Sequence, residues 1–416
     1  MSIPLTPPPK KDPQKRTRVP TLPPAMRSRA ATGISAAAAE GRFALQHCEE
    51  CGTVQYPPRD ACCKCLSVDL TYKDTETGAE VLAETRIHAS PDPFFRERLP
   101  WRQGSVKLDA GPVAVVHLHG DVGRGDRVRM AMKLDKAGQG VLIALPIERT
   151  EAMEDDPTLR GLTAHPKHRR ILITDGRNPV AVPLAMALLK AGASTVFVGE
   201  SEAWRRWPGR AALEAIEGVE IMDLDVSDMR SVTELAGEIG GKTDILINTA
   251  RFVRPGGVTM QDTVFAREEL DVNVLGVMRL AQAFGPGMAG RVQDGTNNAV
   301  AFVNVLSSYA LVPDPAYGAF SASQAAARSV CQTLRGEYRP QGLRVMTVYT
   351  GPTDDEWHQP LPPPKVAPSA LARDIVNGLI EGLEDVYSGD VAKDMFERWQ
   401  RDAKVLEREM TTGGGI

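Results

Sequence analysis

Cysteines offer the clearest chemistry in this chain of 416 residues. Cys48-x2-Cys51 and, ten residues further on, Cys62-x2-Cys65 present four thiols on two short turns. Zn²⁺ prefers four soft ligands in a closed tetrahedron, and a site with all four positions filled leaves no place for a reactive water. The spacing therefore predicts a structural zinc site rather than a disulfide framework. Cys63 is a competing ligand, but the two-residue gap favours Cys62.

Composition and charge exclude several classes of function. The chain carries 49 Lys+Arg against 53 Asp+Glu, a formal net charge of -4, which argues against nucleic-acid binding through bulk charge. No apolar run reaches the roughly 18 residues that a membrane span needs. The basic N-terminus around Lys10 and Arg18 is not followed by the apolar segment of a secretory signal. We therefore expect a cytoplasmic protein that does not act on membranes or nucleic acids.

The elements that must position the cysteines fill the first third of the chain. Residues 1–29 are basic and Pro-rich and are predicted to be a disordered arm. Ala30–Arg42 reads as a helix. Five strand-like runs follow the cysteines and indicate a small barrel, namely Glu80–His88, Ser105–Leu108, Val113–His119, Val128–Met132 and Gly140–Leu145.

The residues around the cysteines resemble a known family. They read Leu45-Gln46-His47-Cys48-Glu49-Glu50-Cys51-Gly52, then Tyr56-Pro57-Pro58-Arg59 and Cys62-Cys63-Lys64-Cys65. This pattern is similar to the zinc-ribbon and OB-fold proteins known as the domain of unknown function 35 family. The resemblance implies a helix, a zinc ribbon and an OB barrel over residues 30–147. It also implies a partner, because members of this family accompany thiolase-like enzymes that act on acyl-CoA. The members themselves have no chemistry of their own.

Two groups in the predicted barrel have alternative interpretations. Phe94-Phe95-Arg96-Glu97-Arg98 and Trp101-Arg102 place aromatic rings beside cations. They either grip a CoA phosphate or a partner enzyme, or pack their rings while the arginine heads reach water. His117 and His119 alternate on a strand, and we expect them to face solvent or the packing rather than a metal.

The second half of the chain has a different periodicity. Residues 148–168 are charged and aperiodic, and we interpret them as a linker to a second domain at 169–416. Alanine-rich helical stretches such as Val182–Ala191 and Ala322–Glu337 alternate there with apolar strands, which indicates a Rossmann-type doubly wound parallel sheet. The predicted strands are Arg170–Thr174, Thr195–Gly199, Val219–Leu224, Ile245–Thr249, Ala299–Leu306 and Leu343–Tyr349.

Six motifs follow one another in this half, namely Asp223-Leu224-Asp225-Val226-Ser227-Asp228, Asp244-Ile245-Leu246-Ile247-Asn248, Asp271-Val272-Asn273-Val274, Val303-Asn304-Val305-Leu306-Ser307-Ser308, Phe320-Ser321-Ala322-Ser323-Gln324-Ala325-Ala326 and Gly351-Pro352. In order and spacing they resemble the short-chain dehydrogenase/reductase family over residues 169–410. The resemblance implies a tyrosine that acts as general acid and a lysine four residues later. Here Phe320 and Gln324 stand at those positions, and a frame shifted to Tyr317 places Ser321 at the lysine position.

The other positions of this family are altered as well. Ser307 and Asn273 match family roles, but without an acid we interpret them as structural hydrogen bonders. The family's glycine-rich cofactor loop reads Thr174-Asp175-Gly176-Arg177-Asn178-Pro179-Val180-Ala181. A carboxylate at 175 repels phosphate, and Pro179 has no N–H to offer. The family's Asn-Asn-Ala-Gly reads Asn248-Thr249-Ala250-Arg251, which places a long side chain where glycine leaves space.

We therefore expect no catalytic residue and no NAD(P) site in this chain. The hypothesis is a non-catalytic accessory subunit of a thiolase-like acyl-CoA enzyme, with acyl-CoA at the interface. Its dehydrogenase-like domain would form homo- or hetero-oligomers or recruit an active short-chain dehydrogenase. Cys331 has no motif and is expected to be buried. The alternative is an NAD(P)-dependent oxidoreductase with an unconventional active site, which cofactor binding would support.

Overall fold

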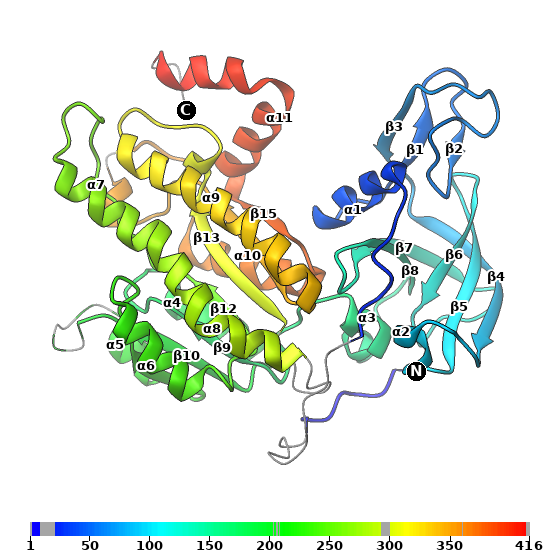
Figure 1. Cartoon of the computed structure of the whole chain (residues 1–416), viewed down its shortest axis with the longest axis horizontal. Helices are drawn as coiled ribbons and strands as arrows, with labels where there is room; N and C mark the ends of the chain where they lie inside the picture. Colours follow the sequence, from blue (N-terminus) through cyan, green and yellow to red (C-terminus); the bar gives the residue numbers. More distant parts are fainter. Residues whose placement is uncertain are drawn as a thin grey trace. The chain divides into compact units, whose positions relative to one another are not determined.

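The computed structural model describes residues 2–8, 21–202, 204, 207, 209–292, 300–359 and 361–412 (Figure 1). Residues 9–20 of the N-terminal arm lie outside the described residues. Two contacts tie down described parts of this arm: Leu5 N donates to Asp155 Oδ2 at 3.0 Å, and Thr21 Oγ1 donates to Glu97 Oε2 at 2.5 Å. The chain divides into two compact units, one built chiefly from Val19–His165 with Ile380–Leu383, the other from Pro166–Leu379 and Glu384–Ile416.

The first unit combines a small ribbon sheet with a closed barrel. After η1 (Arg29–Ala31) and α1 (Thr32–Ala39), the ribbon has the antiparallel order β2-β1-β3. Its strands are β1 (Ala44–Cys48), β2 (Val54–Gln55) and β3 (Leu70–Asp74). The barrel has the order β4-β5-β6-β8-β7, with β4 (Gly78–Ile87), β5 (Trp101–Leu108), β6 (Val113–Leu118), β7 (Arg127–Leu134) and β8 (Gly140–Pro146). A short helix, α2 (Pro93–Arg96), joins β4 to β5.

Alternating burial along the strands builds the barrel core. On β7, Val128, Met130 and Met132 are buried inside, whereas Arg129 faces outward. Helix α1 packs closely on this barrel, because a Cβ on Gly140 would lie 2.8 Å from the backbone of Ile34. Only glycine allows that approach, so the position fixes α1 against the start of β8.

The segment expected to be a linker contains structure. It forms η2 (Met153–Asp155) and α3 (Pro157–Gly161), and Asp156 caps α3 by accepting from Leu159 N at 2.9 Å. Leu159 and Leu162 pack on the outer face of β8 in a satellite cluster with Ile143 and Leu145. A helix of so few residues has no room for a periodic pattern, which is why the sequence reads as aperiodic.

The second unit is a seven-stranded parallel sheet in the order β11-β10-β9-β12-β13-β14-β15. The order reverses between β9 and β12, as in doubly wound Rossmann-type folds, and confirms the predicted fold class. Six strands were predicted and the short edge strand β15 was not. The strands are β9 (Arg170–Ile173), β10 (Thr195–Glu200), β11 (Val219–Asp223), β12 (Ile245–Asn248), β13 (Ala301–Ser307), β14 (Arg344–Thr350) and β15 (Asp385–Ser388).

Helices connect these strands and cover the sheet (Figure 1). The main apolar core lies between the sheet and α6, α8 and α9, with Phe284 and Phe302 fully buried. The helices are α4 (Ala181–Lys190), α5 (Arg210–Glu214), α6 (Met229–Ile239), α7 (Thr263–Leu270), the π-helical η3 (Asp271–Leu275), α8 (Gly276–Val292), η4 (Ser308–Ala310), α9 (Gly318–Tyr338), η5 (Arg339–Gln341), η6 (Glu356–His358), α10 (Pro368–Glu381) and α11 (Gly389–Thr411).

Candidate functional site

The four predicted zinc ligands converge at one end of the ribbon. The Sγ atoms of Cys48, Cys51, Cys62 and Cys65 all lie within 4.8 Å of one another. Cys48 Sγ is 3.5 Å from Cys65 Sγ, and Cys51 Sγ is 3.6 Å from Cys62 Sγ. Tetrahedral zinc with Zn–S bonds of about 2.3 Å needs sulfurs roughly 3.8 Å apart, so this donor set fits Zn²⁺. Cys63 is exposed and does not belong to the group.

The two cysteine turns share one backbone geometry. Gly52 N donates to Cys48 O at 2.9 Å, and Leu66 N donates to Cys62 O at 3.1 Å. Both residues have left-handed φ angles, 70° for Gly52 and 64° for Leu66. Glycine adopts this conformation freely, whereas a leucine is strained there. Each turn thereby aims its two thiols at the same point.

Two buried glutamines hold the turns together. Gln55 Nε2 donates to Gln46 Oε1 at 2.7 Å, and the same oxygen accepts from Arg59 N at 2.9 Å. Gln55 Oε1 accepts from Cys63 N at 2.9 Å. These bonds link β1 and β2 to the second cysteine turn, so the ligand geometry is supported by neighbouring residues. The sequence analysis did not single out either glutamine.

The aromatic residues of the barrel form a half-buried surface cluster. Phe94, Phe95, Trp101 and His117 meet edge to face, with centroids 5.1 to 5.9 Å apart. The Arg98 guanidinium lies 4.0 Å above the Phe94 ring. The rings are therefore only partly packed. This arrangement lies between the two interpretations, a surface that grips a ligand or partner and a cluster that only packs its rings. Burial lowers the pKa of His117 to about 4, so this imidazole is neutral at pH 7.

His119 and Arg102 have structural partners. The His119 ring is buried, and its nitrogens lie 2.9 Å from Met153 O and 3.1 Å from Asp121 N. Arg102 binds Glu84 through Nε at 2.8 Å and donates to His119 O at 2.9 Å. His119 thus faces the packing, as expected, and Arg102 is committed to its own barrel.

In the second unit, backbone N–H groups of the altered cofactor loop form hydrogen bonds within the chain. Asp175 N donates to Thr249 Oγ1 and Gly176 N to Gly199 O, while Arg177 N donates to the Asp175 carboxylate at 2.9 Å. Val180 N and Ala181 N both donate to Asn178, to its side chain and its carbonyl respectively. Burial raises the pKa of Asp175 to about 6, so the group is still chiefly ionised at pH 7. The carboxylate takes donors that a phosphate would need.

The acidic residue at the end of β10 is also occupied. In dinucleotide-binding sheets, an acidic side chain about 20 residues after the glycine loop accepts from a ribose hydroxyl. Here Glu200 is buried and receives both Arg210 Nε and Trp207 Nε1 at 3.0 Å. A second Arg210 nitrogen reaches the other carboxylate oxygen at 3.0 Å. The carboxylate is therefore fully engaged within the chain.

The residues at the family's catalytic positions are packed and bonded to one another. Phe320 is 0% exposed and Gln324 is 2% exposed on α9. Gln324 Oε1 accepts from Ser307 N at 2.8 Å, and Ser307 Oγ accepts from Tyr309 N. Asn273, in the π-helical turn η3, donates to Phe252 O at 2.8 Å and Ser323 Oγ at 2.9 Å. These side chains are thus hydrogen-bonded within the chain.

Arg251 anchors a buried network that the sequence analysis did not foresee. Arg251 Nη2 lies 2.6 Å from Asp355 Oδ2, and His358 Nδ1 lies 2.7 Å from Asp355 Oδ1. Thr353 Oγ1 bonds the same carboxylate. Burial acts to raise the pKa of Asp355, but the hydrogen bond from His358 and the Arg251 cation outweigh it and hold that pKa well below its usual range. The network ties the end of β12 to the segment after β14.

The last turns of α11 pack in the apolar cluster that contains Phe320. Asp402 has extended backbone angles and kinks the helix, and its carboxylate caps the next segment by accepting from Lys404 N and Val405 N. Beyond the kink, Leu406 and Met410 are buried. They join one apolar cluster with Val253, Tyr309, Val312, Tyr317, Phe320, Val391 and Met395. Tyr317 donates its hydroxyl to Trp357 O at 3.0 Å within this cluster.

Cys331 is buried on α9, as expected. Burial raises the pKa of its thiol to about 12, which leaves it protonated and unreactive. No helix among the described residues is long and apolar enough to cross a membrane.

Comparisons with known families agree with both units. A model for the ChsH2 rubredoxin-like zinc ribbon domain matches residues 35–71, and one for the ChsH2 C-terminal OB-fold domain matches residues 72–133. A short chain dehydrogenase model matches residues 169–365.

Individual relatives match the second unit. A short-chain dehydrogenase, cctT of Talaromyces islandicus, is 31% identical over 156 residues, 36% of this chain and 52% of the relative. A 3-ketodihydrosphingosine reductase of Dictyostelium discoideum is 29% identical over 182 residues, 39% of this chain and 53% of the relative. The chain thus spans about half the length of these curated relatives.

Among solved structures, a short chain dehydrogenase from Burkholderia cenocepacia J2315 in complex with NADP is 26% identical, with a TM-score of 0.53. The match covers 59% of this chain and 98% of that one. The ribbon, the closed barrel and the seven-stranded sheet each correspond to one of the matched models. The chain is therefore a fusion of a ChsH2-type zinc ribbon and OB-fold with a domain of the short chain dehydrogenase fold.

Proposed function

We propose that this chain is a non-catalytic accessory subunit of a thiolase-like acyl-CoA enzyme. The ribbon and barrel dock on that enzyme, and Cys48, Cys51, Cys62 and Cys65 hold a structural Zn²⁺. The zinc stabilises the ribbon, because its four thiolates close the coordination sphere. The partner carries out cleavage or formation of a 3-oxoacyl-CoA, and its own nucleophile acts there. The resemblance of the ribbon and barrel to thiolase-associated proteins supports this partner class.

The absence of catalysis in this proposal is supported by the loop at 175–181, whose backbone N–H groups are hydrogen-bonded within the chain. Its backbone donors bind Asp175, Asn178 and neighbouring groups of the chain, so a dinucleotide phosphate would have to displace them. Phe320 at the family's acid position has no proton to give. We therefore infer that the second unit binds no NAD(P) and serves in assembly.

The surface of α8 and α9 supports an assembly role. A groove of about 800 Å³ runs between these helices and is lined by Met278, Gly285, Pro286, Val330 and Leu334, among others. The side chain of Met278 is 40% exposed, and the neighbouring Leu275 is 44% exposed. A second dehydrogenase-type domain that presents its own α8–α9 face would bury this apolar surface. The occupant is either another copy of this chain or an active dehydrogenase subunit.

One experiment separates this proposal from the alternative. The full chain is expressed in its native host and purified through a tag, and its co-purifying proteins and zinc content are measured by mass spectrometry. A stoichiometric thiolase supports the proposal. NADH and NADPH are then titrated with fluorescence detection, where we expect no saturable binding. If the chain purifies alone and binds NADH, the NAD(P)-dependent oxidoreductase reading replaces ours, and its fold likeness to the NADP-bound Burkholderia enzyme then gains weight.

A charge substitution tests the assembly surface. Met278→Glu combined with Val330→Glu places two carboxylates in the groove and is expected to shift the complex to a smaller mass in sedimentation. Met186→Glu is the matched control, because Met186 is 57% exposed on α4, away from the groove. An unchanged mass for the groove variant would contradict the assembly role of this face.

A further inference from the structure

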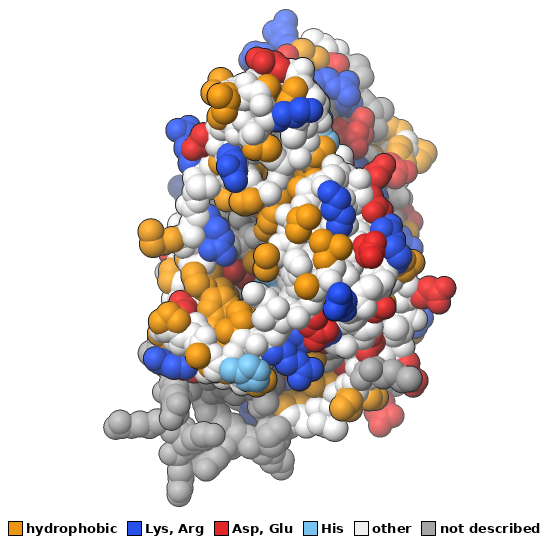
Figure 2. All heavy atoms as spheres, turned by 90° about the vertical axis from the view of Figure 1, so that its right-hand side faces the viewer, with side chains coloured by type: hydrophobic (Ala, Val, Ile, Leu, Met, Phe, Trp, Pro, Cys, Tyr) orange, Lys and Arg blue, Asp and Glu red, His pale blue; other side chains and the backbone are white. Residues whose placement is uncertain are grey.

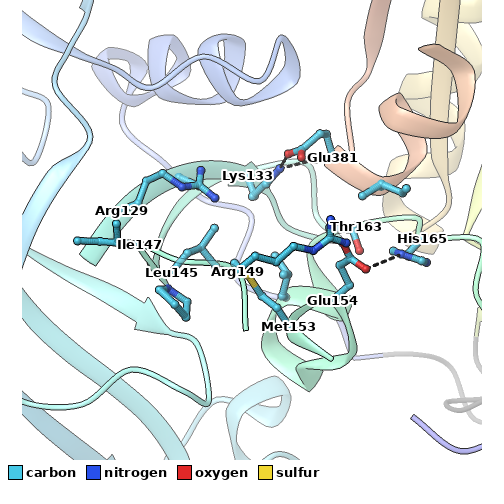
Figure 3. Close-up of a pocket in the computed structure, with 14 residues that line it drawn as sticks. Arg129, Lys133, Leu145, Ile147, Arg149, Met153, Glu154, Thr163, His165 and Glu381 are labelled. Carbon is cyan, nitrogen blue, oxygen red and sulfur yellow. Dashed lines mark hydrogen bonds and ion pairs between the residues drawn. The ribbon is translucent and has the colours of Figure 1, made fainter. Parts of the chain in front are cut away.

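A second hollow lies on the outer face of the barrel in the first unit (Figure 3). Its volume is about 240 Å³. The outward row of β7 forms one side, where Arg129, Ala131 and Lys133 alternate with core residues. The segment from Ile147 to His165 forms the opposite side, and Ile380 and Glu381 of the same unit complete it. None of these residues belongs to the zinc centre or to the barrel's aromatic cluster.

The lining separates into an apolar floor and a charged rim. Leu145 lies beside Arg129 in the register of β8 and β7, and Met153 and Leu159 continue the apolar surface. Figure 3 shows Arg129 beside Ile147 and Leu145, whereas the Arg149 side chain runs toward Glu154 and Thr163. A ligand that fits both parts has an aliphatic body and a charged head.

The charges of the rim determine which charge the head group of a ligand should carry. Lys133 pairs with Glu381, and Arg149 pairs with Glu154, which also lies 3.7 Å from His165 Nε2. Arg129 is the one lining cation of the described chain with no carboxylate within 4 Å. Among the described lining residues, three Arg and Lys side chains stand against two Glu carboxylates, an excess of one positive charge that a monoanion balances.

The volume limits the length of the ligand. At about 240 Å³ the hollow is smaller than the roughly 300 to 1,000 Å³ of pockets that hold drug-sized ligands, so it suits a smaller molecule. A whole dinucleotide or coenzyme A would extend well beyond the hollow. It matches a carboxylate with a short aliphatic chain, because guanidinium forks fit carboxylates in a bidentate manner.

We propose that this hollow binds a short-chain aliphatic carboxylate. Arg129 receives the carboxylate, Arg149 turns from Glu154 to the same head group, and Leu145 and Met153 contact the chain. Glu154 is then an internal competitor for Arg149. This proposal is independent of the proposed function, because it holds with or without a thiolase partner.

Calorimetric titration of the full-length chain tests the proposal, with hexanoate as the probe. We expect saturable binding that is at least about tenfold tighter than that of hexanol or acetate, since each lacks one half of the match. Arg129→Glu should weaken hexanoate binding by about tenfold or more. Glu154→Gln should strengthen it severalfold by removing the competitor. Arg124→Glu is the matched charge control, since Arg124 is exposed and does not line the hollow.

The results that overturn the proposal are equally specific. They are equal hexanoate affinity in Arg129→Glu and in the unmodified chain, equal affinity for hexanol and hexanoate, or tighter binding of inorganic phosphate than of hexanoate. The thermal unfolding of each variant is recorded in parallel. Weakening in Glu154→Gln, with unfolding unchanged, also counts against the proposal, because it would make Glu154 part of the binding surface.

Discussion

Replacing Asp355 by asparagine should destabilise the second unit more than removing its cationic partner, Arg251. The carboxylate accepts from Trp357 N, His358 N and His358 Nδ1 through one oxygen, and from Arg251 and Thr353 through the other. Arg251 and Asp355 are nearly buried, with side chains 13% and 4% exposed. In Asp355→Asn, an amide NH₂ group faces the Arg251 guanidinium, and this cation is left buried without its counter-charge.

The cost follows from the geometry. Breaking a buried ion pair by removing one partner costs about 3 to 5 kcal/mol, and asparagine keeps one acceptor oxygen, so we take about 3 kcal/mol. Arg251→Met leaves the carboxylate with its four other donors and loses one charge-assisted hydrogen bond, about 1.5 kcal/mol. For a unit of this size, 3 kcal/mol lowers the melting temperature by about 6 to 12 °C. Asp355→Asn should therefore cost about twice as much as Arg251→Met.

Thermal and urea unfolding at pH 7 provide the measurement. Four of the five tryptophans belong to the second unit, so tryptophan fluorescence reports chiefly on it. The carboxylate's folded-state pKa is held below its unfolded value, so its contribution is complete above about pH 4 and is lost as the pH falls further. If Asp355→Asn unfolds within 0.5 kcal/mol of the unmodified chain, the network does not stabilise this unit and the reasoning is wrong.

Three further outcomes are expected. Elemental analysis of the purified protein should give one zinc per chain. Cys48→Ser should lose the zinc, whereas Cys63→Ser should keep it. Loss of zinc from Cys63→Ser would contradict the ligand assignment. Burial lowers the pKa of His117 from its ordinary value of 6.5 to about 4, so the contribution of this neutral ring to stability is complete above pH 6.5 and is lost as the pH falls toward 4. His117→Phe should therefore flatten the dependence of the melting temperature on pH in this range. Iodoacetamide should modify Cys331 only after unfolding, as followed by peptide mass mapping, and rapid labelling in the native chain would contradict its burial.

The sequence predicts those parts of the molecule that local pattern determines. Two cysteine pairs at fixed spacing require two turns, and these turns meet as expected. Six strands of the parallel sheet carry apolar runs long enough to recognise. Strand β15 has the four residues Asp385–Ser388, too few for a pattern, and η2 and α3 are short for the same reason.

The network and the apolar cover were beyond sequence reasoning because their members are far apart in the chain. Arg251 was expected to fill space left by glycine, but its partner Asp355 lies 104 residues away and carries no motif. The packing of Leu406 near Phe320 depends on the kink at Asp402. An aspartate within a helical pattern does not predict a kink. Long-range pairing of this kind arises from tertiary packing, which a single sequence does not encode in readable form.

The packing of the last turns of α11 on the cluster around Phe320 would lower the apparent affinity of any ligand that binds there. Burying two side chains such as Leu406 and Met410 stabilises the covered state by about 3 to 6 kcal/mol. The uncovered fraction is then about one molecule in 10² to 10⁴, and the apparent dissociation constant rises by the same factor. A compound with micromolar intrinsic affinity would bind only at concentrations of about 0.1 to 10 mM. We therefore expect a compound that binds beside Phe320 to compete with the last turns of α11.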